Sequence, residues 1–412
     1  MKKRIIASAL AMSFAVPCAF AQDSSNVRIS GFGTGALTWT NTDDAQFARP
    51  NQQTGAKKNP TTGVDSNLGL QIDYKVNNWL SLTGQGLVRK DAQDDFGAEA
   101  SWAFAKAKVS DDVSIRVGRM GMPAFMISDY RNVGYANTML RPPIEVYSQM
   151  LFNTIDGADV TWQHSYGDTT YTAQFAVGRN KTDLISGLNT TGNRIKALNL
   201  VAEHGPLTLR FGRVDGRISL NGSSLPLLLG ALNQAGAAFQ APQATELATE
   251  LDVTNKKASF TSLGGSLDWN NIVVQSEFAK RKTDAYINDT TSWYVMGGYR
   301  FGKILPYYTH AKISIDGSPN TNIACPAGAA AACAPTLAAL SAKAAGLRYT
   351  GLGQGEEQTD SIGVRWDFRN SVALKVQFDH VRPNRASGLL TNAKPGFTSP
   401  VNVGAVALDF VF

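Results

Sequence analysis

The sequence lacks the long apolar runs of a helical membrane protein. Of its 412 residues 43% are hydrophobic, but beyond the N-terminus no stretch of about 18 apolar residues occurs, the length that marks a membrane-spanning helix. Charge is scarce, at 17%, and the 38 glycines follow no period of three. Disorder, a coiled coil and collagen are therefore excluded. A membrane β-barrel is not, because its strands place only every second residue on lipid.

Signatures of catalysis and of cofactor binding are missing too. Only 4 histidines and 3 cysteines are present, and the histidines are scattered along the chain. No G-x-S-x-G, H-E-x-x-H or phosphate-binding glycine loop occurs. We therefore expect no enzyme, no cofactor and no metal site.

The first 21 residues have the pattern of a secretory signal. Lys2, Lys3 and Arg4 precede an apolar stretch, which ends at an A-x-A cleavage site formed by residues 19–21. We expect residues 1–21 to be a cleaved signal peptide. Three of the 39 basic residues lie in it, so the mature chain carries only a small excess over its 33 acidic residues. This charge balance indicates no nucleic-acid partner.

Removal of the signal would leave two cysteines, Cys325 and Cys333. An even pair that closes a short loop in an oxidising compartment is typical of a disulfide. No histidine is close enough in sequence to suggest a zinc site instead, and we predict a Cys325–Cys333 bond.

The dominant pattern of the mature chain is period-2 alternation over segments of about ten residues, bounded by Gly, Asn, Asp and Pro. Residues 360–368 are one example, with apolar side chains at every even position from Ile362. We predict an all-β fold, a closed antiparallel transmembrane β-barrel. Its sixteen strands are expected near 27–38, 65–76, 79–90, 98–109, 112–119, 156–165, 169–179, 194–203, 206–217, 258–269, 271–282, 291–301, 304–315, 357–368, 371–382 and 401–412.

The connections alternate between short turns and long insertions, as in outer-membrane barrels with short periplasmic turns and long extracellular loops. We therefore treat residues 22–412 as one barrel domain. The main insertions are a third loop at 120–153 and extracellular loops at 218–257 and 316–356. The Ala/Leu-rich stretches 220–251 and 327–346 are expected to form short helices.

The sequence resembles the Gram-negative general porins in three places: the opening 27–33 (VRISGFG), Val117-Gly118-Arg119, and the final 408–412 (LDFVF). The resemblance implies a sixteen-stranded homotrimer in the outer membrane, surrounded by lipid and open to ions and small hydrophilic solutes. It also implies that residues 120–153 fold into the lumen as the constriction. The stretch lacks the acidic run of many such porins, which permits a more solute-selective channel.

The candidate constriction residues are charged side chains in or beside that third loop: Arg116, Asp129, Arg131, Arg141 and Glu145. One interpretation makes them an eyelet that binds an anionic or aromatic solute. The other pairs Asp129 with Arg131 and Arg141 with Glu145. The alternation also places basic side chains on the lumen wall, among them Arg28, Arg210, Arg300, Arg365 and Lys375. Their slight excess over wall carboxylates predicts a mild anion preference.

Two other functions fit the same pattern. One is a solute-selective outer-membrane channel for a small organic anion or an aromatic compound. The other is a structural or adhesive barrel, for which the long loops would suit a partner. Steady conductance across a planar bilayer would separate a channel from a plugged barrel.

Overall fold

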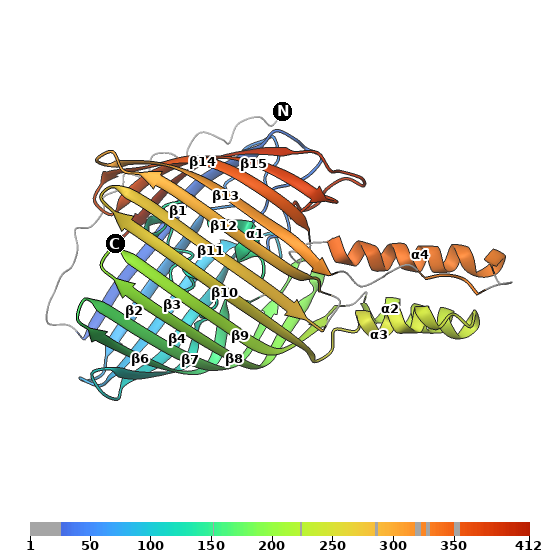
Figure 1. The fold of residues 1–412 in the computed structure, drawn as a ribbon, viewed down its shortest axis with the longest axis horizontal. Coiled ribbons are helices and arrows are strands. Elements are labelled where there is room, and N and C mark those ends of the chain that lie inside the picture. Colours follow the sequence, from blue (N-terminus) through green and yellow to red (C-terminus); the bar gives the residue numbers. More distant parts are fainter. Residues whose placement is uncertain are drawn as a thin grey trace, which may run out of the picture.

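The computed structural model describes residues 26–150, 152–222, 225–284, 287–317, 323–326, 330–349 and 355–412. These residues form one closed barrel of sixteen antiparallel strands (Figure 1). The predicted fold class is confirmed. The expected signal peptide, residues 1–21, lies outside the described residues.

The strands follow one another around the barrel in chain order. The sheet closes where β1 pairs with β16, from Phe32 opposite Val411 to Thr40 opposite Val403. Because of this closure every strand has a partner on both sides, as a sheet in lipid requires. The strand bounds are Val27–Thr40 (β1), Asn67–Lys75 (β2), Leu80–Lys90 (β3), Phe96–Lys108 (β4), Val113–Gly121 (β5), Thr154–Tyr166 (β6), Thr169–Asp183 (β7), Asn189–His204 (β8), Leu207–Asn221 (β9), Lys256–Trp269 (β10), Ile272–Thr283 (β11), Asp289–Tyr299 (β12), Ile304–Gly317 (β13), Glu356–Arg369 (β14), Val372–Arg385 (β15) and Val401–Val411 (β16).

Outward-facing side chains on the strands are mostly apolar. On β14, Ile362, Val364 and Trp366 are 60%, 40% and 46% exposed, whereas Ser361 on the other face is 7% exposed. Alternation of this kind gives a barrel with an apolar outer surface and a polar interior, which is the arrangement that lipid outside and water inside favour.

The connections at one end of the barrel are tight turns. Asn270 and Asn271, with φ of 45° and 72°, turn β10 into β11 in the left-handed conformation that short hairpins favour.

The long loops at the other end are shorter than predicted, because hydrogen-bonded strand pairing continues beyond the segments in which apolar and polar residues alternate. Ile218 still pairs with Lys256, so the predicted loop 218–257 spans only 222–255. Likewise 316–356 becomes 318–355, and 120–153 becomes 122–153.

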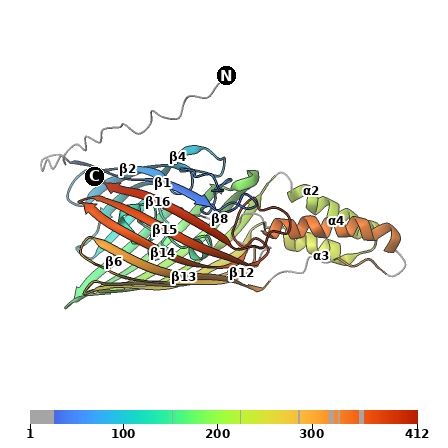
Figure 2. The ribbon, with the colours of Figure 1, turned by 90° about the horizontal axis from the view of Figure 1, so that it is seen from above.

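Three helices extend beyond the barrel at the long-loop end (Figures 1 and 2). They are Leu225–Ala238 (α2), Pro242–Leu251 (α3) and Ala330–Tyr349 (α4), and α2 contacts both others. The helices expected from the Ala/Leu-rich stretches are therefore present. A Cys325–Cys333 disulfide, with Cα atoms 6.0 Å apart, joins the segment before α4 to the helix. None of the helices in the described ranges is long and apolar enough to cross a membrane.

Candidate functional site

The third loop at the long-loop end, residues 122–153, bonds to side chains on the inner face of the wall. The backbone N–H of Met126 donates to Glu277 Oε1 on β11 at 3.0 Å. The backbone N–H of Leu140 donates to Gln377 Oε1 on β15 at 3.1 Å. Glu277 and Gln377 are buried and alternate with exposed positions of their strands. The loop, with its short helix α1 (Ile144–Tyr147), thus lies against the inner wall (Figure 1).

Two of the predicted wall cations hold backbone carbonyls of this loop. Lys375 Nζ donates to the carbonyls of Gly134 and Asn137 at 2.7 and 2.6 Å. Arg365 donates to the Asn137 carbonyl at 2.8 Å. Each cation also pairs with a wall carboxylate, Asp409 and Asp367 respectively. Lys375 and Arg365 therefore fix the loop, and they add little net charge to the lumen.

Gly134 marks the closest approach of the loop to the wall. A Cβ at this position would stand 2.1 Å from Asp409 Oδ1 and 2.5 Å from Thr34 Oγ1. Those two wall side chains are hydrogen-bonded to each other at 2.6 Å. A larger residue at position 134 would have to displace these two hydrogen-bonded side chains, so glycine suits this close contact.

Arg141 links the loop to two buried carboxylates, one in the first long loop and one on the wall. Its guanidinium donates to both carboxylate oxygens of Asp65, at 3.0 and 2.8 Å, and to Asp379 at 2.6 Å. All three side chains are 2–3% exposed. Burial opposes the charge of Arg141, but the two carboxylates outweigh it and hold its pKa above the ordinary value. The alternative pairing with Glu145 is not formed, because Asp65 and Asp379 occupy the guanidinium.

Glu145, on α1, is buried without an ion-pair partner in the described part of the chain. It is 1% exposed, and its Oε1 atom makes no hydrogen bond. Burial raises the pKa of its carboxyl from the usual 4.5 to about 7, and the charge of Asp379 acts in the same direction.

Arg131 lies in a positively charged part of the lumen. It is 8% exposed and donates to Asn153, while its Nε atom is unpaired and no carboxylate among the described residues forms an ion pair with it. Burial and then the neighbouring charges of Arg89 and Arg49 lower its pKa. The proposed pairing with Asp129 is not formed, and Asp129 is exposed instead.

Arg116 is neutralised on the wall. Its Nε donates to both oxygens of Asp159 on the neighbouring strand β6, at 3.1 and 3.0 Å, and its guanidinium stacks over the Phe104 ring. Asp129 attracts this charge from a greater distance.

The remaining wall residues are dispersed. Arg210 donates to Asn199 at 2.6 Å and leaves one terminal nitrogen unpaired. Arg300 pairs with Asp268 at 2.8 Å near the short-turn end. Arg28 is exposed at the start of β1. Arg28 and Arg300 thus lie at the end opposite to the long loops.

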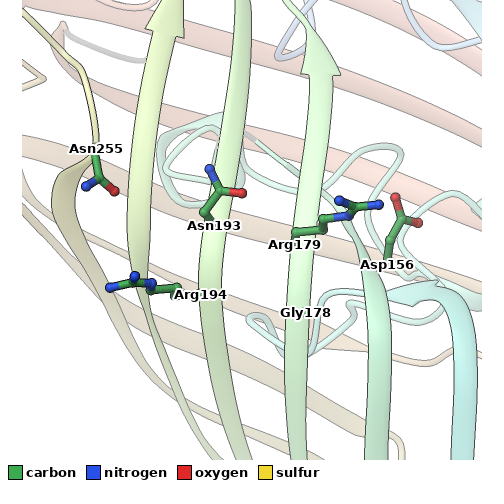
Figure 3. A pocket seen from close by; sticks show the side chains of 6 residues that line it. All are labelled: Asp156, Gly178, Arg179, Asn193, Arg194 and Asn255. Carbon is green, nitrogen blue, oxygen red and sulfur yellow. The ribbon is translucent and has the colours of Figure 1, made fainter.

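A separate hollow of about 590 Å³ lies on the barrel's outer face near the long-loop end (Figure 3). It is lined by Asp156, Gly178, Arg179, Asn193, Arg194 and Asn255. Arg179 continues the outward-facing row of β7 that includes Phe175 and Val177, so this hollow is not part of the lumen.

Sequence reasoning missed three groups that shape the inner site. Asp65 opens the predicted strand 65–76 at an inward parity but lies in the first long loop, two residues before β2 begins at Asn67, and Arg49 lies within that loop, where alternation gives no information. Arg89 falls at an inward position of a predicted strand and could have been found by parity, since Gln85 and Leu87 of the same row are buried.

No family model and no curated protein matches this chain. Solved structures do match it. OmpF of Salmonella typhi, in complex with daunomycin, is 12% identical with a TM-score of 0.54, over 94% of this chain and 97% of that one. An anion-selective porin from Comamonas acidovorans is 11% identical with a TM-score of 0.52, over 94% and 99%. The outer-membrane channel DcaP of Acinetobacter baumannii is 10% identical with a TM-score of 0.54, over 94% and 97%. At these identities the likeness shows a shared fold, that of sixteen-stranded porins.

Proposed function

We propose that this protein is an outer-membrane channel for the passive diffusion of ions and small hydrophilic solutes. The observation that carries the proposal is a closed sixteen-stranded barrel, apolar outside, with residues 122–153 bonded to its inner wall. Barrels of this size enclose a water-filled lumen. The loop narrows that lumen and sets the size limit for solutes. Residues 1–21 supply the export signal, and the barrel assembles as a homotrimer in lipid.

The charges left without partners favour anions. Arg116, Arg141, Arg365 and Lys375 are each balanced by carboxylates. Arg131 forms no ion pair in the described part of the chain, and Arg49 adds positive charge beside it, whereas the nearby Arg89 is paired with Glu99 at 3.0 Å. Unbalanced cations at a narrow point raise the local concentration of anions. The proposed preference therefore rests on Arg131 and Arg49, and Arg141 instead anchors the loop.

Reversal potentials in a potassium chloride gradient across a planar bilayer test the proposal. The native protein should give steady open channels with a mild chloride preference. Replacing Arg131 and Arg49 together with Ala should shift the reversal potential toward the cation value. The control Lys343→Ala, an exposed lysine of α4, should leave it unchanged. A folded protein without steady channels would instead favour the structural or adhesive barrel.

A further inference from the structure

The outer face of the barrel changes from apolar to basic toward the long-loop end. On β7 the outward residues Phe175 and Val177 are 48% and 41% exposed, and the next outward residue is Arg179. On the neighbouring strand β8, Leu200 is followed toward the same end by Lys196, which lies opposite Val177. Apolar side chains face the hydrocarbon of a membrane, whereas basic ones keep their charge in its polar surface. This change therefore marks the level of the lipid head groups.

Two irregularities of strand pairing bring polar side chains to this level. The register between β7 and β8 shifts between Gly178 and Asn180, and that between β8 and β9 shifts between Asn193 and Lys196. Arg194 lies in the second irregularity with a φ of 51°, in the left-handed region that residues other than glycine seldom adopt. Successive residues of a regular strand point to opposite faces, but here Asn193 and Arg194 are both exposed.

These irregularities adjoin the hollow of about 590 Å³ on the outer face (Figure 3). Arg179 and Arg194 line it from β7 and β8, and Asn255 lines it from the residue before β10. Neither arginine forms an ion pair with a carboxylate of the described residues. Asp156, the acidic residue of the lining, is already bonded to Arg119 at 2.6 and 2.8 Å. The hollow therefore carries a net positive charge.

Two further cations lie directly opposite each other beside the hollow. Arg217, on the outward row of β9 that includes Phe211, is paired with Lys257 of β10 and, on its other side, with Asn193 of β8. Like charges at directly opposite positions destabilise a sheet. Arg217 donates to the Asn255 carbonyl at 2.9 Å, and no carboxylate in the described ranges forms an ion pair with it or with Lys257. An anion would relieve the repulsion among the cations at this place, which are Arg179, Arg194, Arg217 and Lys257.

We propose that this hollow binds the phosphate group of an anionic lipid in the leaflet at the long-loop end. Arginine matches phosphate with two parallel N–H donors, and the side-chain amides of the asparagines add further donors. The basic residues begin directly beyond Val177, so a lipid whose chains pack against Phe175 and Val177 places its phosphate at their level. Basic pockets at a membrane surface recognise lipid head groups in this way. Such binding requires only the membrane position of the barrel and no channel activity.

Native mass spectrometry of the full mature protein, refolded in lipid-free non-ionic detergent, tests the site. Phosphatidic acid, whose head group is a bare phosphate, and phosphatidylcholine, whose choline neutralises the phosphate, are added separately. The native chain should retain phosphatidic acid in preference to phosphatidylcholine. Arg179→Gln/Arg194→Gln should bind phosphatidic acid about tenfold more weakly, because two cations that attract the phosphate are lost. The control Lys75→Gln/Lys303→Gln, which removes two exposed lysines beside the short turns, should bind like the native protein.

Two further measurements separate a lipid site from other sources of attraction. Arg179→Lys/Arg194→Lys keeps both charges but loses the paired guanidinium donors, so its retention of phosphatidic acid should also fall. In calorimetric titrations, inorganic phosphate should bind far more weakly than a short-chain phosphatidic acid, because it has no chains to pack against the apolar surface. Circular dichroism confirms that each variant is folded.

Three results would overturn the proposal. Equal retention of phosphatidic acid by the native protein and by Arg179→Gln/Arg194→Gln would place the lipid elsewhere. Unchanged retention in the lysine variant would indicate general attraction between charges. Equal affinity for inorganic phosphate and for phosphatidic acid would assign the hollow to a free ion.

Discussion

At the scale of single residues, partners decide what each lumen charge does. Arg141 and Arg131 belong to the same loop and are both almost fully buried. Arg141 is enclosed by two carboxylates and holds the loop in place. Arg131 donates to an amide and lies near two other arginines, so no carboxylate in the described part of the chain pairs with its charge. Residue type alone does not separate these roles.

Replacing Arg141 with Met should release the third loop without unfolding the barrel. The change leaves Asp65 and Asp379 buried and unpaired, which costs about 3–5 kcal/mol for a broken buried ion pair. We expect faster proteolysis within 122–153 and an unchanged far-ultraviolet spectrum. In the control Arg300→Met, the broken pair with Asp268 is exposed and costs at most about 1 kcal/mol. Equal cleavage of the Arg141→Met variant and the native protein would contradict the anchoring role.

Glu145 should make the stability of the loop fall as pH rises. Its folded pKa of about 7 lies above the usual 4.5, so the folded state binds the proton more tightly than the unfolded state does. The stabilisation is complete below pH 4.5 and is lost as pH rises through 7. Asp379, Glu357 and His310 are the charged or titratable groups that act on it.

Thermal melting from pH 5 to 8 measures this effect, and Glu145→Gln should flatten the slope. The comparison between the two proteins removes the contribution of the histidines, which titrate in the same range. Identical slopes in both proteins would show that Glu145 does not control loop stability.

At the scale of single strands, the face of the sheet to which a residue points decides how much a substitution destabilises the barrel. Val160 lies at the middle of β6 and is 44% exposed on the outer face, whereas Thr161 faces inward and is partly exposed. Val160→Arg places a charge in lipid and should cost about 2–4 kcal/mol in a refolding titration. Thr161→Arg, its matched control, should cost much less. Equal costs would contradict the assignment of faces.

The positions of the strands, and the face to which each of their residues points, were the part of the fold that the sequence could predict. A strand that separates lipid from a wet lumen must alternate apolar and polar side chains. Segments such as 360–368 can therefore be recognised as strands from the sequence. The strand ends next to the long loops could not be placed this way, since alternation fades there and pairing such as Ile218 with Lys256 leaves no pattern. The contacts of the third loop could not be predicted from the sequence either. Asp65 reaches Arg141 only because the first and third loops meet inside the barrel, and no local periodicity encodes that meeting.

At the scale of the whole molecule, the barrel and the third loop have different structural roles. Closure satisfies the backbone and makes a wall of inward side chains, while the loop brings its own charges to that wall. Lys375 and Arg365 of the wall and Arg141 of the loop are used where the two meet. We expect ion preference to depend on the few cations that neither hold the loop nor pair with carboxylates, rather than on the small net charge of the chain.

Anion preference should therefore depend strongly on salt. Screening acts over about 30 Å at 0.01 M salt but only about 3 Å at 1 M. In dilute potassium chloride the field of Arg131 and Arg49 should span much of a wet lumen, and in concentrated salt it should reach only ions in contact. We expect the chloride preference, measured as a reversal potential at a fixed concentration ratio, to be larger in dilute salt and to fade in concentrated salt. A native channel that favours potassium in dilute salt would mean that these two arginines do not face the path of the ions.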